Sequence, residues 1–320
     1  MAKLLRGRAP GVRGRGGTAA GLVGLWGLRV VWVVLPLGLG PGVGPAIDRV
    51  GGGGALLLEG CLWAAWFAGL VAAAVPSPAG LTAVRILAPL TVPVAGVAAI
   101  GPTGSVNTAA LALAHGLLAT GVAFSPVVGD RMVNGSAYGS ERRMALRPPA
   151  FVLAGPVQLL WGAMAATAIG GPLLLATDHV IAGTVVSVAA VGLWWLGWRV
   201  LHQLSRRWLV FVPAGFVIHD HLLTVEAILL RRTTVAALGP APAAVPEPVD
   251  GPVQPVVDLS GGAYGLSLEA VLETTVRFGR RRGRNINEIE TSRIIFTPTL
   301  PGAVLAEART RAIAIGTLTA

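Results

Sequence analysis

The sequence predicts an α-helical membrane bundle of six transmembrane helices, followed by a small, mainly-β cytoplasmic domain. Hydrophobic residues make up 53% of the 320 residues and charged residues only 12%, which is about half the charge of a soluble domain. Six apolar stretches fill the first two thirds of the chain, and the composition changes after Leu201. These features exclude an ordinary soluble globular protein, and they equally exclude a disordered chain.

The first 18 residues are expected to form a disordered basic tail, because they contain five cations, five glycines and no acid. Residues 19–201 are expected to form the transmembrane domain, because each apolar stretch approaches the ~20 residues that a helix needs to cross a bilayer. The predicted spans are Ala20–Gly40, Ala55–Val75, Leu81–Ile100, Thr108–Val128, Ala150–Ala176 and Val180–Leu201.

The distribution of arginines predicts the orientation of these spans. With the N-terminus in the cytoplasm, thirteen cations of the tail, the loops and the inner ends of the spans lie inside, and only Arg49 lies outside. Positive charge in short loops favours the cytoplasmic side. We therefore expect a multi-pass protein of the cytoplasmic membrane, with the N-terminus and the C-terminal domain both in the cytoplasm.

Residues 202–320 contain short runs typical of β-strands rather than apolar runs of membrane length. Side chains such as Val276 and Phe278 recur with period two, as in half-buried strands. The expected strands are Trp208–Val212, Phe216–His219, Thr224–Leu230, Leu266–Leu272, Thr275–Phe278 and Arg293–Thr297, with a closing helix over Ala303–Ile313. The proline-rich segment 239–255 is expected to be a stiff insertion that does not pair as a strand.

Two segments carry a resemblance to a known domain family. Arg206–Asp220 is similar to the opening hairpin of bacterial pleckstrin-homology-like (PH-like) domains, and Arg293–Arg311 is similar to their last strand and capping helix. The resemblance implies a small β-barrel or sandwich capped by a C-terminal helix. The chain as a whole resembles uncharacterised multi-pass membrane proteins of high-GC actinobacteria, a resemblance that implies no activity.

Three polar residues within the predicted spans are candidates for a functional site. Arg29 lies nine residues into the first span, which corresponds to a depth of ~13 Å near the bilayer centre. Glu59 and His115 lie one and two turns into their spans from the outer side. Together they would suit a small transporter. Alternatively, Arg29 extends to the cytoplasmic face and His115 simply bonds a neighbouring helix.

Two groups of arginines are candidate contacts for anionic lipid headgroups or phosphate. Arg142, Arg143 and Arg147 belong to the loop 129–149, whereas Arg280, Arg281, Arg282 and Arg284 form a predicted hairpin tip. Arginine matches phosphate geometry, and anionic lipids attract such clusters. A solvated tip and an ordinary positive-inside loop are the alternatives. Nucleic acid is not an expected partner, because no aromatic residues alternate with these arginines.

Other chemistry finds little support in the sequence. The single cysteine, Cys61, excludes an intrachain disulfide and multi-cysteine metal sites, and Lys3 is the only lysine. His219 and His221 could share a metal on one strand face, but further ligands are not evident, and we expect no metal and no cofactor.

The leading hypothesis is a membrane protein that presents its β-domain to a protein partner or to anionic lipid headgroups. The absence of catalytic motifs speaks against an enzyme. The alternatives are a small transporter and an enzyme that acts on a lipid-linked substrate, the latter resting on the loop 129–149.

Overall fold

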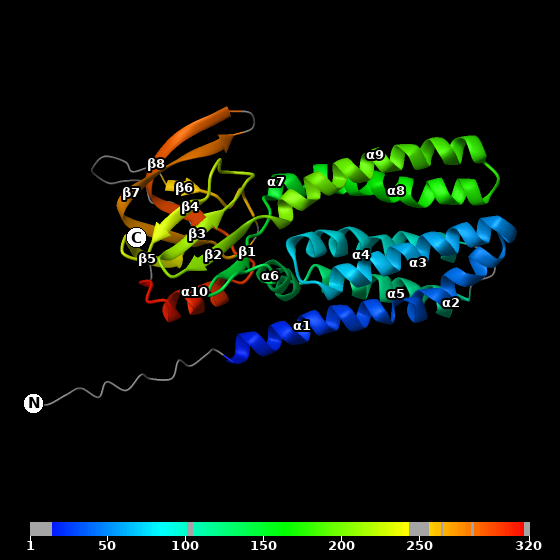
Figure 1. Ribbon diagram of the computed structural model, residues 1–320, viewed down its shortest axis with the longest axis horizontal. Coiled ribbons are helices and arrows are strands. Elements are labelled where there is room, and N and C mark those ends of the chain that lie inside the picture. Colours follow the sequence, from blue (N-terminus) through cyan, green and yellow to red (C-terminus); the bar gives the residue numbers. More distant parts are fainter. Residues whose placement is uncertain (1–14, 101–104, 243–255, 264, 283–284, 317–320) are drawn as a thin grey trace, which may run out of the picture.

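The computed structural model describes residues 15–100, 105–242, 256–263, 265–282 and 285–316. A helical bundle and a β region lie end to end along the long axis of the molecule (Figure 1). We name the end of the bundle next to the β region the proximal end, and the opposite end the distal end. The helices of the bundle are α1 (Arg15–Val33), α2 (Leu35–Asp48), α3 (Gly52–Ala74), α4 (Pro78–Ala99), α5 (Val106–Ala123), α6 (Pro126–Asn134), α7 (Ala150–Leu153), α8 (Pro156–Ala176) and α9 (Val180–Ser205).

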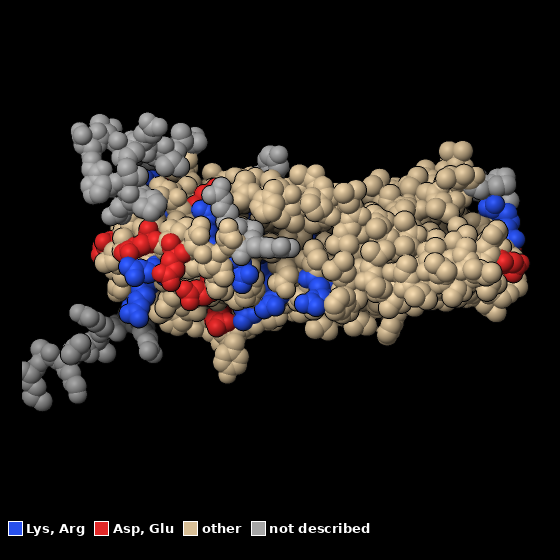
Figure 2. Space-filling model, turned by 90° about the horizontal axis from the view of Figure 1, so that it is seen from above, with Lys and Arg blue, Asp and Glu red and all other residues tan. Residues whose placement is uncertain are grey.

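Six segments of the bundle are long and apolar enough to cross a membrane, as the sequence predicts. They are Gly24–Asp48, Gly52–Ala74, Pro78–Ala99, Val106–Ala123, Ala150–Ala176 and Val180–Ser205. Charged side chains in Figure 2 gather on the β region and at the distal end, with a long uncharged belt between them. This arrangement is that of a multi-pass membrane protein.

Two spans differ from their predicted bounds by five residues or more at one end, and α1 begins inside the expected N-terminal tail. The first span continues to Asp48, because Pro41 and Pro45 are accommodated inside α2. The fourth ends at Ala123, because Ser125 caps a new helix, α6, by accepting a hydrogen bond at its hydroxyl oxygen from the Val128 amide in the first turn. Of the expected tail, residues 15–18 already belong to α1, and residues 1–14 lie outside the described residues.

The β region consists of two four-stranded sheets that share one core. Strands β1 (Arg142–Ala145), β2 (Trp208–Val212), β3 (Gly215–His219) and β4 (Ile228–Arg231) form the first sheet in that order. The second sheet has the order β5 (Val235–Pro240), β7 (Leu268–Arg282), β8 (Asn285–Phe296), β6 (Val256–Asp258). Helix α10 (Pro301–Thr310) contributes to the same core, which includes Leu209, Phe211, Phe216, Ile218, Ala270, Ile294, Phe296, Val304 and Ala308.

Strand β1 comes from the loop 129–149, outside the boundary that the sequence suggests for the β domain at residue 202. It pairs antiparallel with β2, with Arg142 opposite Phe211 and Ala145 opposite Trp208. Four residues are too few to show a period-two pattern, and the partner strand lies far along the sequence. The β region therefore includes residues on both sides of the last two membrane helices.

The remaining strands differ from the predicted runs in several places, and β5, β6 and the part of β8 before Arg293 correspond to no predicted run. The two runs predicted over 266–278 are one strand, β7, with an irregularity between Val271 and Val276. The run predicted from Thr224 begins only at Ile228, because the Thr224 hydroxyl donates to the carbonyl oxygens of Asp220 and Glu226 in a turn. The segment 239–255 pairs at its start, since Gly239 and Pro240 end β5, and residues 243–255 lie outside the described part of the chain.

The β region is packed directly onto the bundle. Ala145 of β1 and Trp208 of β2 belong to the same buried cluster as Leu28, Trp32, Leu81 and Met132 of the helices. Because apolar side chains of both parts exclude water together, we infer that the β region is docked rather than loosely tethered.

Candidate functional site

The three polar residues predicted within the spans are not brought together. Arg29 donates from Nε to the carbonyl oxygen of Ala73 (3.1 Å) and from Nη2 to that of Ala74 (2.9 Å), which are the last residues of α3. These carbonyls carry the negative end of the helix dipole. Arg29 therefore lies at the proximal end of the bundle, and not midway through it as the predicted first span implies.

His115 and Glu59 occupy separate environments. The Nε2 atom of His115 lies 3.1 Å from the carbonyl oxygen of Val31, in the last turn of α1, and the imidazole fits only because Gly38 has no side chain. Glu59 lies on α3 and lines an apolar groove between α2, α3 and α4. The three residues thus do not form a common polar pathway.

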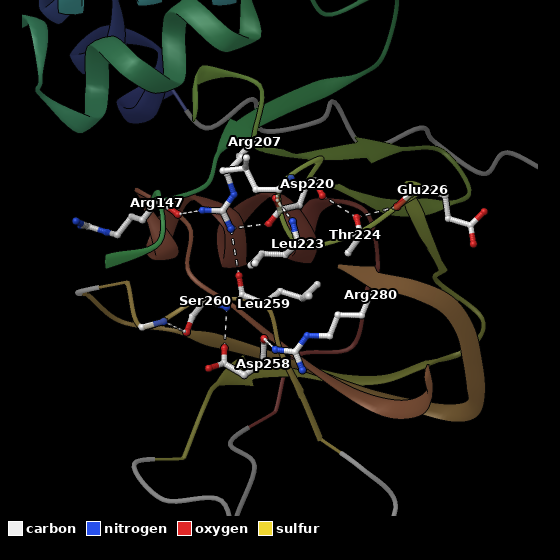
Figure 3. A network of polar contacts seen from close by, with 12 residues as sticks. Arg147, Arg207, Asp220, Leu223, Thr224, Glu226, Asp258, Leu259, Ser260 and Arg280 are labelled. Atoms are coloured by element: carbon white, nitrogen blue, oxygen red, sulfur yellow. Dashed lines mark hydrogen bonds and ion pairs between the residues drawn. The ribbon is translucent and has the colours of Figure 1, made fainter. Parts of the chain in front are cut away.

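A buried ion pair organises the part of the β region that faces the bundle (Figure 3). Arg207 Nη2 lies 2.5 Å from Asp220 Oδ2, and the two side chains are 1% and 0% exposed. Arg207 also donates to the carbonyl oxygens of Arg147 and Leu259. One guanidinium therefore connects the segment after β1, the start of β2, the end of β3 and the segment after β6.

The residues next to this pair in the sequence, together with Arg143, meet on the side of the β region that packs against the bundle. The His219 ring stacks on Trp208, with centroids 5.0 Å apart, and contacts the His221 ring edge-on at 4.2 Å. Arg206, which follows α9 directly, donates to His221 Nε2 at 3.2 Å. The Arg143 guanidinium lies 5.6 Å from the centre of the Trp208 ring.

Arg281 completes this group from the second sheet. Its backbone amide donates to the Leu223 carbonyl oxygen, in the turn that follows His221, and its side chain is exposed. We call this group the histidine junction and define it as Arg143, Arg206, Trp208, His219, His221 and Arg281.

Both histidines of the junction are neutral at physiological pH. Burial, together with the nearby His221, Arg206 and Arg143, lowers the pKa of His219 to about 4. Burial also lowers the pKa of His221, and Arg206 and Arg281 act in the same direction. Because a guanidinium cannot accept a hydrogen bond, its contact with His221 Nε2 requires the lone pair of a neutral imidazole.

Two of the three cations of the junction, Arg206 and Arg281, have no acidic partner among the described residues, whereas Arg143 pairs with Glu141. The Asp220 carboxylate is taken up by Arg207. Such a half-buried group attracts an anion. It is poorly suited to a metal, and the described part of the chain contains no cluster of three or more potential metal ligands.

The predicted lipid contacts of the loop 129–149 divide between structural and surface positions. Arg142 donates to Asp130 Oδ2 at 2.8 Å, and burial raises the pKa of the Asp130 carboxyl group while Arg142 opposes that shift. Arg143 lies 3.3 Å from Glu141 and belongs to the junction. The Arg147 side chain is half-buried against Gly265. Arg142 is therefore part of the packing between α6 and β1.

The predicted tip of the β7–β8 hairpin is described only in part. Arg280 donates from Nη2 to the Asp258 carbonyl oxygen at 2.9 Å, and Arg281 belongs to the junction. Arg282 ends β7, and Arg284 lies outside the described residues. In Figure 1 this hairpin projects from the β region on the same upper side as α9.

Sequence reasoning missed Arg206, Arg207 and Trp208 as members of a site. Both arginines are among the thirteen cations that predict the orientation of the spans. The available signal was the alternation of His219, Asp220 and His221 at the end of a strand, which places the carboxylate on the opposite face from the imidazoles.

Comparison of the chain with protein-family models, with curated proteins and with solved structures finds no match in any of the three.

Proposed function

We propose that this protein is a binding protein of the cytoplasmic membrane, and that its histidine junction holds the phosphate of an anionic lipid headgroup. The observation that supports this most strongly is the convergence of Arg143 and Arg281, from two distant predicted clusters, on two adjacent neutral imidazoles. Guanidinium and neutral imidazole groups both donate hydrogen bonds to phosphate.

The position of Arg206 favours a lipid over a soluble phosphate compound. It is the first residue after α9, the last membrane helix, so it lies where the headgroup layer meets the protein. The attraction of each arginine to an anionic surface is ~1 kcal/mol. The arginine asymmetry of the sequence supports a cytoplasmic placement of the β region.

The β region is proposed to be a PH-like domain. Its strand-rich architecture and the closing helix α10 support this, and so do the hairpin of β2 and β3 and the passage from β8 into α10. Two features are additions to the expected pattern, namely β1 from the loop 129–149 and the parallel pairing of β6 with β8.

The test uses the full chain in nanodiscs that contain a mixture of anionic and zwitterionic lipid. Lipids that remain bound after transfer to mild detergent are quantified by mass spectrometry, and anionic lipid should be enriched over the starting mixture. The double variant Arg206→Gln/Arg281→Gln should lose that enrichment, and so should the wild-type protein in high salt.

Arg277→Gln is the matched control, because Arg277 lies on the same strand as Arg281 but pairs with Glu290 on an exposed surface. It should retain the enrichment. A double variant that enriches anionic lipid as well as the wild type would refute the proposal. A folded wild-type protein that enriches no anionic lipid would instead favour a protein partner for the β region.

A further inference from the structure

An apolar groove opens between three membrane helices and contains one carboxyl group. The groove has a volume of about 340 Å³ and is lined by α2, α3 and α4 together with Trp32 of α1. Its ionisable lining residue is Glu59, and Thr91, the other polar residue of the lining, donates its hydroxyl to the Ala88 carbonyl oxygen of its own helix. The volume falls within the range of small-molecule sites.

Glu59 has no partner within the described part of the chain. It is the one acid inside a described candidate span other than Asp48, which ends the first span. None of the described ion pairs or hydrogen bonds involves its side chain. Seven residues after the start of α3, the helical rise places it ~10 Å below the distal end of the helix. A carboxylate at such a depth is costly unless a cation compensates it.

Three indoles line the groove, and Trp63 lies about one turn along α3 from Glu59. The indole N–H of Trp32 donates to the Trp66 carbonyl oxygen (2.8 Å), and that of Trp66 donates to the Trp32 carbonyl oxygen (2.9 Å). Trp63 meets Trp66 edge-to-face at 5.4 Å and is 52% exposed. Because the N–H groups of Trp32 and Trp66 are bonded within the protein, these two indoles contribute apolar rings to the wall of the groove. The exposed Trp63 ring, beside Glu59 on α3, is placed to attract a cation.

Small residues keep the rest of the groove open. A Cβ atom added at Gly40 or Gly44 of α2 would have no neighbour within 4 Å. The lining continues from Glu59 and Ile47 near the distal end to Leu35 and Leu87 nearer the middle of the helices. The groove therefore has the polarity of an amphiphile, with one charged end and a long apolar part.

From these features we infer a binding site for a lipophilic cation, an ammonium amphiphile whose head pairs with Glu59 and whose hydrocarbon tail lies along α2. The head lies near Trp63, and the tail extends toward the middle of the membrane. This site is separate from the histidine junction and does not depend on the function proposed for it. A lipid acyl chain would fill the apolar part but would leave Glu59 without a partner.

The experiment measures quenching of tryptophan fluorescence in the full chain, reconstituted in nanodiscs of zwitterionic lipid. The probes are dodecyltrimethylammonium with a brominated tail and an uncharged sugar amphiphile with the same tail. The cationic probe should quench at a concentration about tenfold lower than the neutral probe, as one unscreened charge contact predicts. Equal quenching by the two probes would overturn the proposal.

Three variants locate the effect. In Glu59→Gln, the cationic probe should quench only at the concentration that the neutral probe requires. Asp48→Asn removes the same charge from an exposed position at the distal end and should leave the quenching by both probes unchanged. Gly40→Leu should weaken the binding of both probes, because the leucine side chain occupies the space expected for the hydrocarbon tail. Folding is verified by thermal unfolding and size-exclusion chromatography.

If Glu59→Gln still prefers the cationic probe over the neutral one, the cation does not bind at Glu59. The same conclusion holds if Asp48→Asn loses this preference as fully as Glu59→Gln does. If Glu59→Gln fails to fold, the proposal is still tested by two results. These are the ratio of the quenching concentrations of the two probes in the wild type and the effect of Gly40→Leu on both concentrations. Undiminished quenching in folded Gly40→Leu would place the tail outside the groove.

Discussion

Arg207 and Asp220 form an ion pair that is almost completely excluded from water, with a separation of 2.5 Å between Nη2 and Oδ2. The carboxylate is satisfied further, because Asp220 Oδ1 accepts from the amides of Leu222 and Leu223. Since the same pair fixes the backbone on either side of it, it also fixes the positions of His219, His221 and Arg206.

Removal of one partner of this pair should destabilise the β region strongly. Arg207→Met leaves a buried carboxylate without its cation, which costs about 3–5 kcal/mol. Thermal unfolding of the detergent-solubilised chain should therefore shift clearly to lower temperature. Arg277→Gln, which breaks an exposed pair with Glu290, should leave the transition unchanged. Equal transitions in the two variants would contradict the structural role of Arg207.

The stability of the protein should fall as the pH decreases from about 6.5 to about 4. The pKa of His219 is lowered from 6.5 to about 4 in the folded protein. In that window the unfolded chain binds a proton that the folded chain does not, so acid favours unfolding. Because the ring is only half-buried, we expect a contribution of about 1 kcal/mol.

His219→Gln removes this titration and should flatten the dependence of the unfolding midpoint on pH in that range, although the lost stacking on Trp208 lowers the midpoint throughout. The unfolding midpoints of both proteins, measured at several pH values between 4 and 8, test this expectation. An identical slope in the variant would mean that another group is responsible.

The β region should not fold properly without β1. A fragment that begins at Gln203 exposes the unpaired edge of β2 and the Trp208 side chain, and exposed strand edges pair with other chains. We expect this fragment to associate, whereas a fragment with Ser140–Leu146 joined through a flexible linker should be monomeric. Light scattering and circular dichroism distinguish the two. A monomeric, cooperatively folding fragment without β1 would show that this strand is dispensable.

The orientation predicted from the arginines is open to a direct test. In a Cys61→Ala background, a cysteine at Ser136, which is exposed near the β region, should resist an impermeant thiol reagent added to whole cells. A cysteine at Gly53, at the distal end, should react. Labelling of the Ser136 position from outside would place the β region outside the cell.

The spans were predictable because a run of about 20 apolar residues is a local property of the sequence. Strand β2 and the capping helix were predictable for the same reason, since each has its own periodic pattern. Strand β1 was not, because Arg142–Ala145 becomes a strand only through its pairing with β2.

The sites were less predictable, because they depend on contacts between distant segments. The sequence indicates that Glu59 and Arg29 are unusual, but only the packing of α1 against α3 brings Arg29 to the carbonyl groups of Ala73 and Ala74. Likewise, Arg143 and Arg281 are evident as charges, whereas their proximity to His219 and His221 requires the assembled sheets.

The pairing of β1 with β2 has a consequence for biogenesis. The ribosome makes Arg142–Ala145 before α8 and α9, and Trp208–Val212 after them, so β1 can pair with β2 only if α8 and α9 insert as a pair or neither of them inserts. If only one of the two helices crossed, β1 and β2 would lie on opposite sides of the membrane. The pairing of β1 with β2 therefore couples the insertion of α8 to that of α9, and a chain in which only one of them had inserted would expose the unpaired edge of β2.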